Sequence, residues 1–335
     1  MTDFTEIIKI LMENRSFLLT THVNPDADAI GSEMAMYIVL KRLGKDVRIV
    51  NFSPTPSFLE FLDKQHVVEQ YNPAVHDEYF LNCDVVISLD FNNPDRTVKM
   101  SPLYDRRKGL KICIDHHLEP VTEKFTHMMA IPDYAATAHL MYDFIVKTGV
   151  TNIDKELAVP IYSGIATDTG NFKFERTTPE LHRIAANLLE QGVVPIEIND
   201  LIYGQDSLSK FALLGRALNS LHIYGDDRRL GIMSLSQSDF EATHAIESDT
   251  EGFINLCMAI QGVKLGAIFI ELKEGFKVSL RSKQGYDIRQ IAAHFGGGGH
   301  KHAAGIRIRD FHLSDKIDEI INYILEKTEE ENENV

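Results

Sequence analysis

The segment SFLLTTHVNPDADAIGSEMAMYIVLKRLG, residues 16–44, decides the fold. It begins with an apolar run typical of a buried strand and then passes through a turn that carries His22, Asp26 and Asp28. A helical pattern follows and ends at Gly44, since glycine is the usual residue just past a helix end. A strand that leads directly into a helix is the first half of a βαβ unit, so the segment predicts an α/β architecture.

The same alternation of strands and helices continues through residue 190. Three more apolar runs predict strands at residues 46–51, 83–90 and 110–117. Continuous Val, Ile and Leu in the last two runs are typical of strands covered on both faces, as in a parallel sheet. Helical patterns follow at residues 135–147, 154–165 and 179–190. These patterns predict a doubly wound, mainly parallel α/β domain over residues 1–195.

A different pattern begins after a helical connector at residues 206–222. Strands are predicted at residues 228–236, 264–273, 275–283 and 303–310, and helices at 251–260 and 287–295. We therefore expect a helical linker at 196–222, a smaller α+β substrate-binding domain at 223–330 and an acidic tail at 331–335. The whole acidic segment 327–335 is expected to fray.

The composition limits the classes of partner. The chain of 335 residues has a net charge of −15, which disfavours duplex DNA because such binding needs many Lys and Arg contacts to phosphates. Its cysteines are far apart, so we expect buried, reduced thiols: Cys83, Cys113 and Cys257. The N-terminus lacks the features of a signal peptide, and no apolar stretch reaches the ~20 residues that span a bilayer. These features predict a cytoplasmic protein without a membrane partner.

Acidic and imidazole side chains follow three of the predicted strands. The first strand leads to His22, Asp26 and Asp28, the second ends at Asp90, and the third ends at residues 115–117, which read DHH. Ligands of open α/β sheets bind at the carboxyl edge of the strands, so these groups should converge there. Uncompensated buried carboxylates are costly, and imidazole with carboxylates suits Mn²⁺, Fe²⁺ or Zn²⁺. The sequence therefore predicts a divalent metal site.

Other interpretations of the acidic segments are available. The NPD turn alone is also typical of a helix cap. An EF-hand is excluded because Ile30 and Tyr37 occupy its fifth and twelfth positions. Asp168 follows an apolar helical run and precedes Gly170; alone it indicates a helix end, and as a further carboxylate it completes a second metal position.

The segment IAAHFGGGGHKHAAG, residues 291–305, is the main feature of the second domain. Its four glycines allow close backbone approach to a ligand, and their N–H groups can form an anion-binding concavity. His300, Lys301 and His302 add donors, and Arg281 can clamp a phosphate. The segment fits neither a Rossmann nor a P-loop pattern. A flexible loop is the alternative interpretation.

HVNPDADAIGS, SLD, DHH and GIATDTGNF, in this order, resemble the four motifs of the DHH phosphoesterase superfamily. SLRSK and the glycine segment resemble its associated C-terminal substrate-binding domain, so the resemblance covers essentially the whole chain. The arrangement is most similar to the bacterial oligoribonuclease, or nano-RNase, branch. That branch implies hydrolysis of oligoribonucleotides of two to five nucleotides to 5′-mononucleotides, and removal of the 3′-phosphate of 3′-phosphoadenosine 5′-phosphate (pAp).

The resemblance also implies roles for individual residues. His22, Asp26 and Asp90 would hold one Mn²⁺, with Mg²⁺ as the other candidate. A second cation would take four ligands, with the first of them shared: Asp90, Asp28, His116 and Asp168. Asp115 would orient the histidines and His117 would face the scissile phosphate. The far end of the nucleotide would contact residues of the second domain: Arg281, Ser282, Gly297, Gly298, Gly299, His300 and His302.

These implied roles predict metal-assisted phosphoester hydrolysis of short RNA and nucleotides, and they allow a homodimer. Three alternatives stay open at the level of sequence. They are a cyclic-dinucleotide phosphodiesterase, a RecJ-like single-strand exonuclease and a non-catalytic nucleotide-binding module. The complete ligand set argues against the last one, because a degenerate binder usually loses a ligand.

Overall fold

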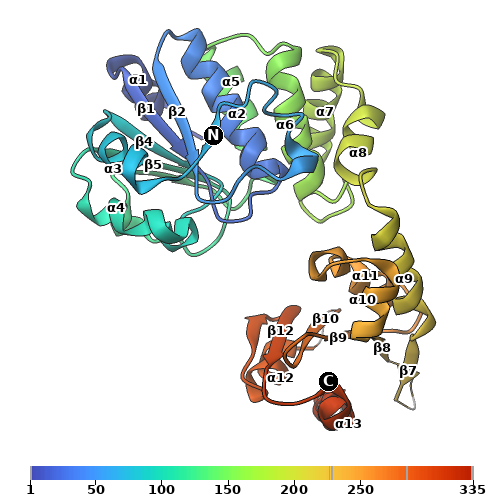
Figure 1. The fold of residues 1–335 in the computed structure, drawn as a ribbon. Coiled ribbons are helices and arrows are strands. Elements are labelled where there is room, and N and C mark those ends of the chain that lie inside the picture. Colours follow the sequence, from blue (N-terminus) through green and yellow to red (C-terminus); the bar gives the residue numbers. More distant parts are fainter. Residues whose placement is uncertain (1, 226, 228, 284–285, 333–335) are drawn as a thin grey trace. The chain divides into compact units, whose positions relative to one another are not determined.

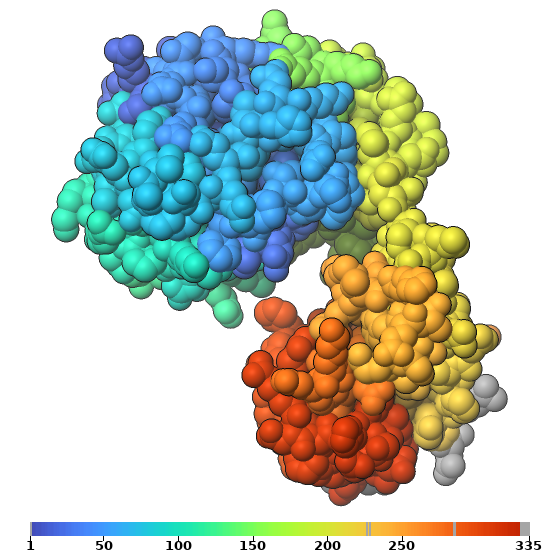
Figure 2. Space-filling view, in the orientation of Figure 1, coloured from blue at the N-terminus to red at the C-terminus, as the bar shows by residue number. Residues whose placement is uncertain are grey.

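The computed structural model describes residues 2–225, 227, 229–283 and 286–332. The chain forms two compact units, Met1–Gln205 and Asp206–Val335, coloured from blue to yellow-green and from yellow to red in Figure 2. The division falls within the predicted linker: α8 (Pro195–Tyr203) belongs to the first unit and α9 (Leu208–Asn219) to the second.

The first unit contains a six-stranded sheet in the order β3-β2-β1-β4-β5-β6 (Figure 1). Every strand pair is parallel, which confirms the predicted sheet type. The strands are β1 (Ser16–Thr20), β2 (Asp46–Asn51), β3 (Val68–Gln70), β4 (Val85–Leu89), β5 (Leu110–Asp115) and β6 (His127–Ala130). After β1 the chain adds β2 and β3 on one side of that strand, and then β4, β5 and β6 on its other side. The topological switch point therefore lies between β1 and β4.

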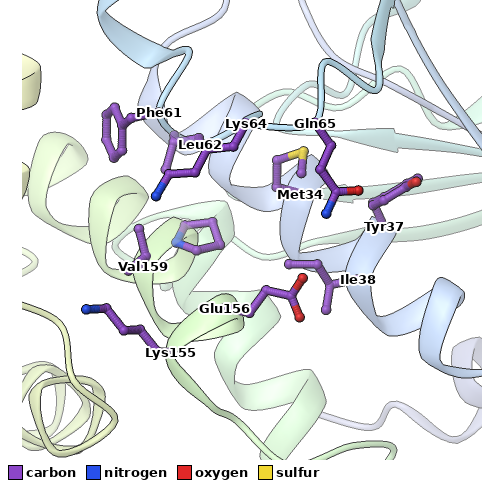
Figure 3. A pocket seen from close by; sticks show the side chains of 11 residues that line it. Met34, Tyr37, Ile38, Phe61, Leu62, Lys64, Gln65, Lys155, Glu156 and Val159 are labelled. Carbon is purple, nitrogen blue, oxygen red and sulfur yellow. The ribbon is translucent and has the colours of Figure 1, made fainter.

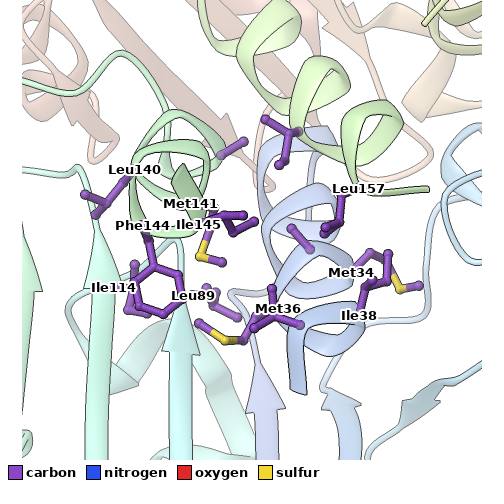
Figure 4. Packing of buried hydrophobic residues seen from close by; sticks show 14 of the residues in the cluster. Met34, Met36, Ile38, Leu89, Ile114, Leu140, Met141, Phe144, Ile145 and Leu157 are labelled. Atoms are coloured by element: carbon purple, nitrogen blue, oxygen red, sulfur yellow. The ribbon is translucent and has the colours of Figure 1, made fainter. Parts of the chain in front are cut away.

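Helices cover both faces of this sheet, and the strands supply alternate side chains to each face. Phe17 and Leu19 of β1 belong to one apolar cluster, while Leu18 belongs to another on the opposite face. Buried residues of six helices belong to the first cluster: α1 (Thr5–Glu13), α2 (Ala27–Arg42), α5 (Thr137–Thr148), α6 (Lys155–Asp168), α7 (Pro179–Glu190) and α8. The second includes α3 (Pro73–Asn82) and α4 (Ser101–Arg106). Figure 4 shows Met36 of α2 and Phe144 of α5 directed toward Leu89 and Ile114.

Helices α2, α5 and α6 pack so closely at Gly31 and Gly164 that neither position has space for a side chain. A Cβ at Gly164 of α6 would lie 2.6 Å from Asp28 Oδ1 and 2.6 Å from Ala138 Cβ. A Cβ at Gly31 of α2 would meet the carbonyl oxygen of Pro160. This close packing fixes the start of α2, where Asp28 lies, against α5 and α6.

The second unit contains a mixed six-stranded sheet in the order β11-β12-β10-β9-β8-β7. Among its described strands, β8 and β9 pair in parallel and the other neighbours pair antiparallel. Its strands are β7 (His222–Tyr224), β8 (Leu230–Leu235), β9 (Leu265–Glu271), β10 (Phe276–Ser282), β11 (Gly298–His300) and β12 (Ala303–Ile308). One face packs on α12 (Ile288–His294) and α13 (Leu313–Asn332), and the other on α9 and α11 (Phe253–Met258). The remaining helix is α10 (Gln237–Thr243).

Short 3-10 helices connect several of these elements: Ser57–Leu59, Pro94–Met100, Thr122–Lys124 and Glu247–Thr250. All three cysteines are free and buried, as expected. Within the described ranges, the chain has no helix with the length and apolarity that a membrane crossing requires.

Two local predictions were wrong. The segment 327–335 was expected to fray, but residues 327–332 continue α13, and 333–335 lie outside the described residues. Ile320, Ile321, Ile324 and Thr328 are buried on one face of this helix, so packing outweighs the acidic composition. The alternative interpretation of the glycine run as a flexible loop was also wrong, because residues 298–300 form β11, which pairs with β12.

Candidate metal centre

The predicted metal ligands converge at the carboxyl edge of the first sheet. His22 comes two residues after β1, and Asp90 directly follows β4. Three groups of side chains each have ligand atoms within 4.8 Å of one another: His22, Asp26 and Asp90; Asp28, His116 and Asp168; and Asp90, His116 and His117. All six predicted ligands belong to these groups, and they lie at the switch point where open α/β sheets bind ligands.

Two histidines present one ring nitrogen to the cluster and use the other on the backbone. His22 Nδ1 lies 2.9 Å from the carbonyl oxygen of Val23, and its Nε2 lies 3.4 Å from Asp90 Oδ2. His116 Nδ1 lies 3.3 Å from the carbonyl oxygen of Tyr134, and its Nε2 lies 3.1 Å from Asp168 Oδ2. Donation from Nδ1 to a carbonyl leaves Nε2 free as the ligand atom, which is the usual arrangement in metal sites.

Asp26 combines a structural and a site role. Its Oδ1 accepts hydrogen bonds from the backbone N–H groups of Asp28 and Ala29, each at 3.0 Å, and so caps the N-terminus of α2. The helix-cap interpretation of the NPD turn is therefore correct, and it is compatible with the metal interpretation. Its second carboxylate oxygen, Oδ2, makes neither of these bonds.

Asp28 is fully buried and lies at the N-terminus of α5. Its Oδ2 accepts from the N–H of Thr137 at 2.6 Å, and its Oδ1 accepts from the N–H of Ala138 at 2.8 Å. Helix α5 has no side-chain cap from its own N-cap residue, Ala136. The carboxylate of Asp28 thus takes the place of the cap, since free N–H groups at a helix start favour an anion.

Asp90 stands in the middle of the cluster in a left-handed backbone conformation, with φ of 64°. This conformation is uncommon for a residue other than glycine and concentrates at functional sites. The Thr137 hydroxyl donates to its Oδ1 at 2.9 Å, and His116 Nε2 lies 3.6 Å from the same atom. Asp90 belongs to two of the three ligand groups: it lies with His22 and Asp26 in one, and with His116 and His117 in the other.

Burial and mutual repulsion perturb these carboxylates. Burial, followed by the charge of Asp168, raises the pKa of Asp28 to about 8. Burial and the charge of Asp28 raise the pKa of Asp90 well above its usual value. Crowded, buried carboxylates need a positive charge among them to stay ionised. Oxygen and imidazole donors in this number and spacing fit divalent cations.

His117 has a different environment from His116. Its Nδ1 lies 2.7 Å from Asp115 Oδ1, and its side chain is 40% exposed whereas Asp115 is fully buried. Asn92 donates from Nδ2 to the carbonyl oxygens of His117 and Leu118. The ring of His117 is thus held at Nδ1 by a buried carboxylate, while the side chain stays partly exposed.

The residues predicted to bind substrate form a local group in the second unit. Arg281 and Ser282 end β10, and Ser282 Oγ lies 3.0 Å from His302 Nδ1. The glycines at 297 and 299 lie against β12, where a Cβ would meet the backbone of Gly305 or Ala303. Glycine is thus required there for packing as well as for any approach of a ligand.

A cavity of about 520 Å³ beside the metal cluster contains residues that the sequence prediction missed. It is lined by His116, Ala135, Asp168, Lys173, Phe174, Glu175 and Arg176. Thr137 was missed as well, although it contacts two predicted ligands. An aromatic residue between basic residues, in the KFER run at residues 173–176 directly after the fourth motif, is the sequence signal that could have indicated the cavity.

A second cavity of the first unit, about 260 Å³, lies between α2, α6 and the loop after β2 (Figure 3). Its walls combine apolar side chains such as Met34, Phe61 and Val159 with Lys64 and Lys155. None of its lining residues is a predicted metal ligand, so the acidic cluster is not part of this cavity.

Comparison with known proteins assigns both units. Residues 16–165 match the N-terminal domain of the DHH family, and residues 244–330 match the DHHA1 domain. The chain is 35% identical to the bifunctional oligoribonuclease and PAP phosphatase NrnA of Thermus thermophilus, over 92% of this chain and 89% of that protein. It is 25% identical to the protein of the same name from Bacillus subtilis, over 93% and 96% of the two chains.

A solved structure agrees with this assignment. The crystal structure of an exopolyphosphatase-related protein from Bacteroides fragilis matches with a TM-score of 0.88 and 30% identity, over 96% of this chain and 95% of that one. Two domain matches in the expected order, a relative at 35% identity and an acidic cluster at the switch point agree with the resemblance found in the motifs. The chain therefore belongs to the DHH family.

Proposed function

We propose that this protein is a metal-dependent phosphoesterase that hydrolyses short oligoribonucleotides to 5′-mononucleotides and removes the 3′-phosphate of pAp. The observation that carries the proposal is the convergence of the six predicted ligands at the switch point of the first sheet. The names of the Thermus and Bacillus relatives, which cover about nine tenths of this chain, support the substrate class.

In this proposal Mn²⁺ is the preferred cation, with Mg²⁺ as the alternative. His22, Asp26 and Asp90 would hold one cation. Asp28, His116 and Asp168 would hold the other, with Asp90 shared between the two. Bound there, the two cations would lower the pKa of a water and neutralise phosphoryl oxygens. The protein supplies fixed ligands, because Thr137 and the N-terminus of α5 hold Asp90 and Asp28 in place.

His117 is the proposed catalytic residue outside the ligand set. Asp115 holds its Nδ1, so the half-exposed ring directs Nε2 away from that carboxylate. A histidine oriented in this way can contact the scissile phosphate and protonate the leaving oxygen. In the second unit, the far end of the nucleotide would be bound by Arg281, Ser282, Gly297, Gly298, Gly299, His300 and His302.

The proposed preference for short substrates follows from charge. A long single strand needs a basic track along the protein, and the net charge of −15 disfavours one. We expect a dinucleotide to be hydrolysed with a higher kcat/KM than a 20-mer of the same composition.

The test is a comparison of kcat/KM in Mn²⁺ across dinucleotides, pAp, cyclic di-AMP, pyrophosphate and a 20-mer. The variant Asp90→Asn should lose measurable turnover because the residue belongs to two ligand groups. Asp105→Asn changes an exposed aspartate of the same unit and should keep full activity. A preference for the 20-mer or for cyclic di-AMP, or an active Asp90→Asn enzyme, would overturn the proposal.

A further inference from the structure

The cavity beside the metal cluster contains both metal-ligand and substrate-binding chemistry within the first unit. Two of its lining residues, His116 and Asp168, are proposed metal ligands. The others come mainly from the segment that follows α6, where Lys173, Phe174 and Arg176 lie within eight residues of Asp168. A phosphate held at the cluster would therefore have these side chains as neighbours.

Phe174 has the geometry of a stacking platform. It is 60% exposed although it is a large apolar side chain. A Cβ at Gly170 would lie 2.5 to 2.9 Å from three carbons of its ring, so the ring packs against a position that only glycine leaves open. The ring is thus supported from Gly170 and still accessible to solvent. Exposed aromatics beside a phosphate site are typical of surfaces that stack nucleobases.

The backbone around Phe174 is fixed rather than free. Gly170, Asn171 and Phe172 have φ values of 55°, 57° and 63°, three left-handed residues in succession. The carbonyl oxygen of Thr169 accepts from the N–H groups of both Lys173 and Phe174, at 2.8 and 3.1 Å. A strained conformation persists only where neighbouring bonds enforce it, so the position of the ring is defined before a ligand binds.

Lys173 and Arg176 bring positive charge to a cavity that also contains the carboxylates of Asp168 and Glu175. Arg176 Nη1 donates to the carbonyl oxygen of Tyr134 at 3.3 Å, the same atom that His116 Nδ1 approaches. One basic side chain is thus anchored next to a proposed ligand, and another lies in the same cavity. Basic groups that share a cavity with an exposed aromatic suit a nucleotide, which combines a flat base with phosphate oxygens.

We propose that this cavity is a nucleotide subsite in which Phe174 stacks on the nucleobase while Lys173 and Arg176 contact phosphate oxygens. The inference rests on the proposed function, because it places next to the metal cluster the nucleotide whose phosphate is cleaved. It makes Phe174 a specificity-determining residue that favours phosphoesters carrying a base over phosphoesters without one.

The test measures binding of AMP and of ribose 5-phosphate to the full-length protein by titration calorimetry in Mn²⁺. Phe174→Ala should weaken AMP binding about 10-fold to 100-fold, the range expected for loss of one stacked base. Its affinity for ribose 5-phosphate should stay unchanged, and Phe174→Trp should keep AMP affinity because the flat surface remains. Phe211→Ala, which removes a 59% exposed phenylalanine of α9, is the matched control and should change neither affinity.

Equal AMP affinity in wild type and Phe174→Ala would overturn the subsite, as would an equal loss for AMP and ribose 5-phosphate. Kinetics separate this inference from the proposed function. If the wild-type enzyme hydrolysed no oligonucleotide or pAp but Phe174→Ala selectively weakened AMP, the proposed function would fail and the subsite would stand. If the wild type hydrolysed dinucleotides and Phe174→Ala did so with the same KM, the subsite alone would fail.

Discussion

At the scale of single residues, Asp90 shows how the protein holds a crowded anionic centre. Its left-handed backbone brings the carboxylate between His22 and His116, whose Nε2 atoms lie 3.4 and 3.6 Å from its two oxygens. The Thr137 hydroxyl fixes one of these oxygens from the neighbouring helix. Residues that hold a ligand in this way are expected to control metal affinity almost as strongly as the ligand itself.

The first prediction concerns Thr137, which is fully buried. Thr137→Val keeps the shape of the side chain and removes only the hydrogen bond to Asp90. We expect Mn²⁺ affinity to fall about 10-fold to 100-fold, measured by titration calorimetry. Thr148→Val, at the other end of the same helix, removes a bond to the carbonyl oxygen of Phe144 and should leave the affinity intact. Similar affinities for the two variants would exclude a positioning role for Thr137.

The second prediction concerns Glu33, a fully buried carboxylate of α2 that accepts from Asn51 Nδ2 at 2.7 Å. Burial raises its pKa to about 8, the Asn51 bond opposes the rise, and the charge of Asp63 adds to it. The folded state therefore favours the protonated acid. Its contribution to stability is fully present below the unfolded pKa of 4.5 and is lost as the pH rises to about 8.

Glu33→Gln should remove this pH dependence. Between pH 5.5 and 8, the free energy of unfolding of the wild type should fall by about 2–3 kcal/mol more than that of the variant. Urea unfolding in EDTA measures the difference without a contribution from bound metal. Glu13→Gln, at a 62% exposed side chain, should behave as wild type, and parallel pH profiles for Glu33→Gln and wild type would contradict the assignment.

At the scale of elements, the contact of α2 with α6 decides whether Asp28 reaches the site. Gly164 lets α6 approach Asp28 and Ala138 so closely that a single methyl group has no space. The same approach places Asp168, the last residue of α6, 3.1 Å from His116. Helix packing and ligand geometry therefore depend on one position.

The third prediction compares two helical glycines: a Cβ would clash with neighbouring atoms at Gly164 and would meet open space at Gly215. Gly164→Ala should lower the free energy of unfolding by about 1–3 kcal/mol through overpacking and also weaken Mn²⁺ binding. Gly215→Ala in α9, where a Cβ would meet nothing within 4 Å, should raise stability by about 0.5–1 kcal/mol because alanine is the better helix former. Urea unfolding measures the free energy of unfolding of both variants. A stabilised Gly164→Ala variant would show that α6 can move away from α2 and α5 without loss of stability.

At the scale of the whole molecule, the proposed metal ligands and the proposed base platform all belong to the first unit, and the proposed far-end contacts belong to the second. A cation that binds only the folded first unit stabilises that unit by about 2.7 kcal/mol at 100 times its Kd. The second unit has its own apolar clusters and contributes no proposed ligand.

The fourth prediction is therefore an asymmetric response to metal. Hydrogen exchange measured by mass spectrometry on the full chain should show Mn²⁺-dependent protection in β1, α2, β4 and β5. Strands β8, β9 and β10 should exchange at the same rate with Mn²⁺ and with EDTA. Asp90→Asn should abolish the difference. Uniform protection of both units, or none, would place the metal elsewhere.

The sequence alone was sufficient for the sheet type, most helices and the convergence of the acidic groups. Continuous apolar runs predict buried parallel strands, and the carboxyl ends of such strands share one edge, so His22, Asp90 and His116 had to approach one another. The order of motifs then indicated the family. These inferences rest on apolar runs and motifs, each of which is contained in a short stretch of the sequence.

Only the tertiary structure decided what holds the site and what lies beside it. The bonds from α5 to Asp28 join residues 109 and 110 positions apart, and the cavity at Phe174 depends on a left-handed turn over Gly170. Helix α13 is anchored by apolar residues of its earlier turns, such as Ile320 and Ile324, which pack in the core of the second unit. Patterns of residue type specify which surfaces are apolar and where charges stand along a strand. Contacts between distant elements arise from the packing of those surfaces, and that packing determines which helix end meets which carboxylate.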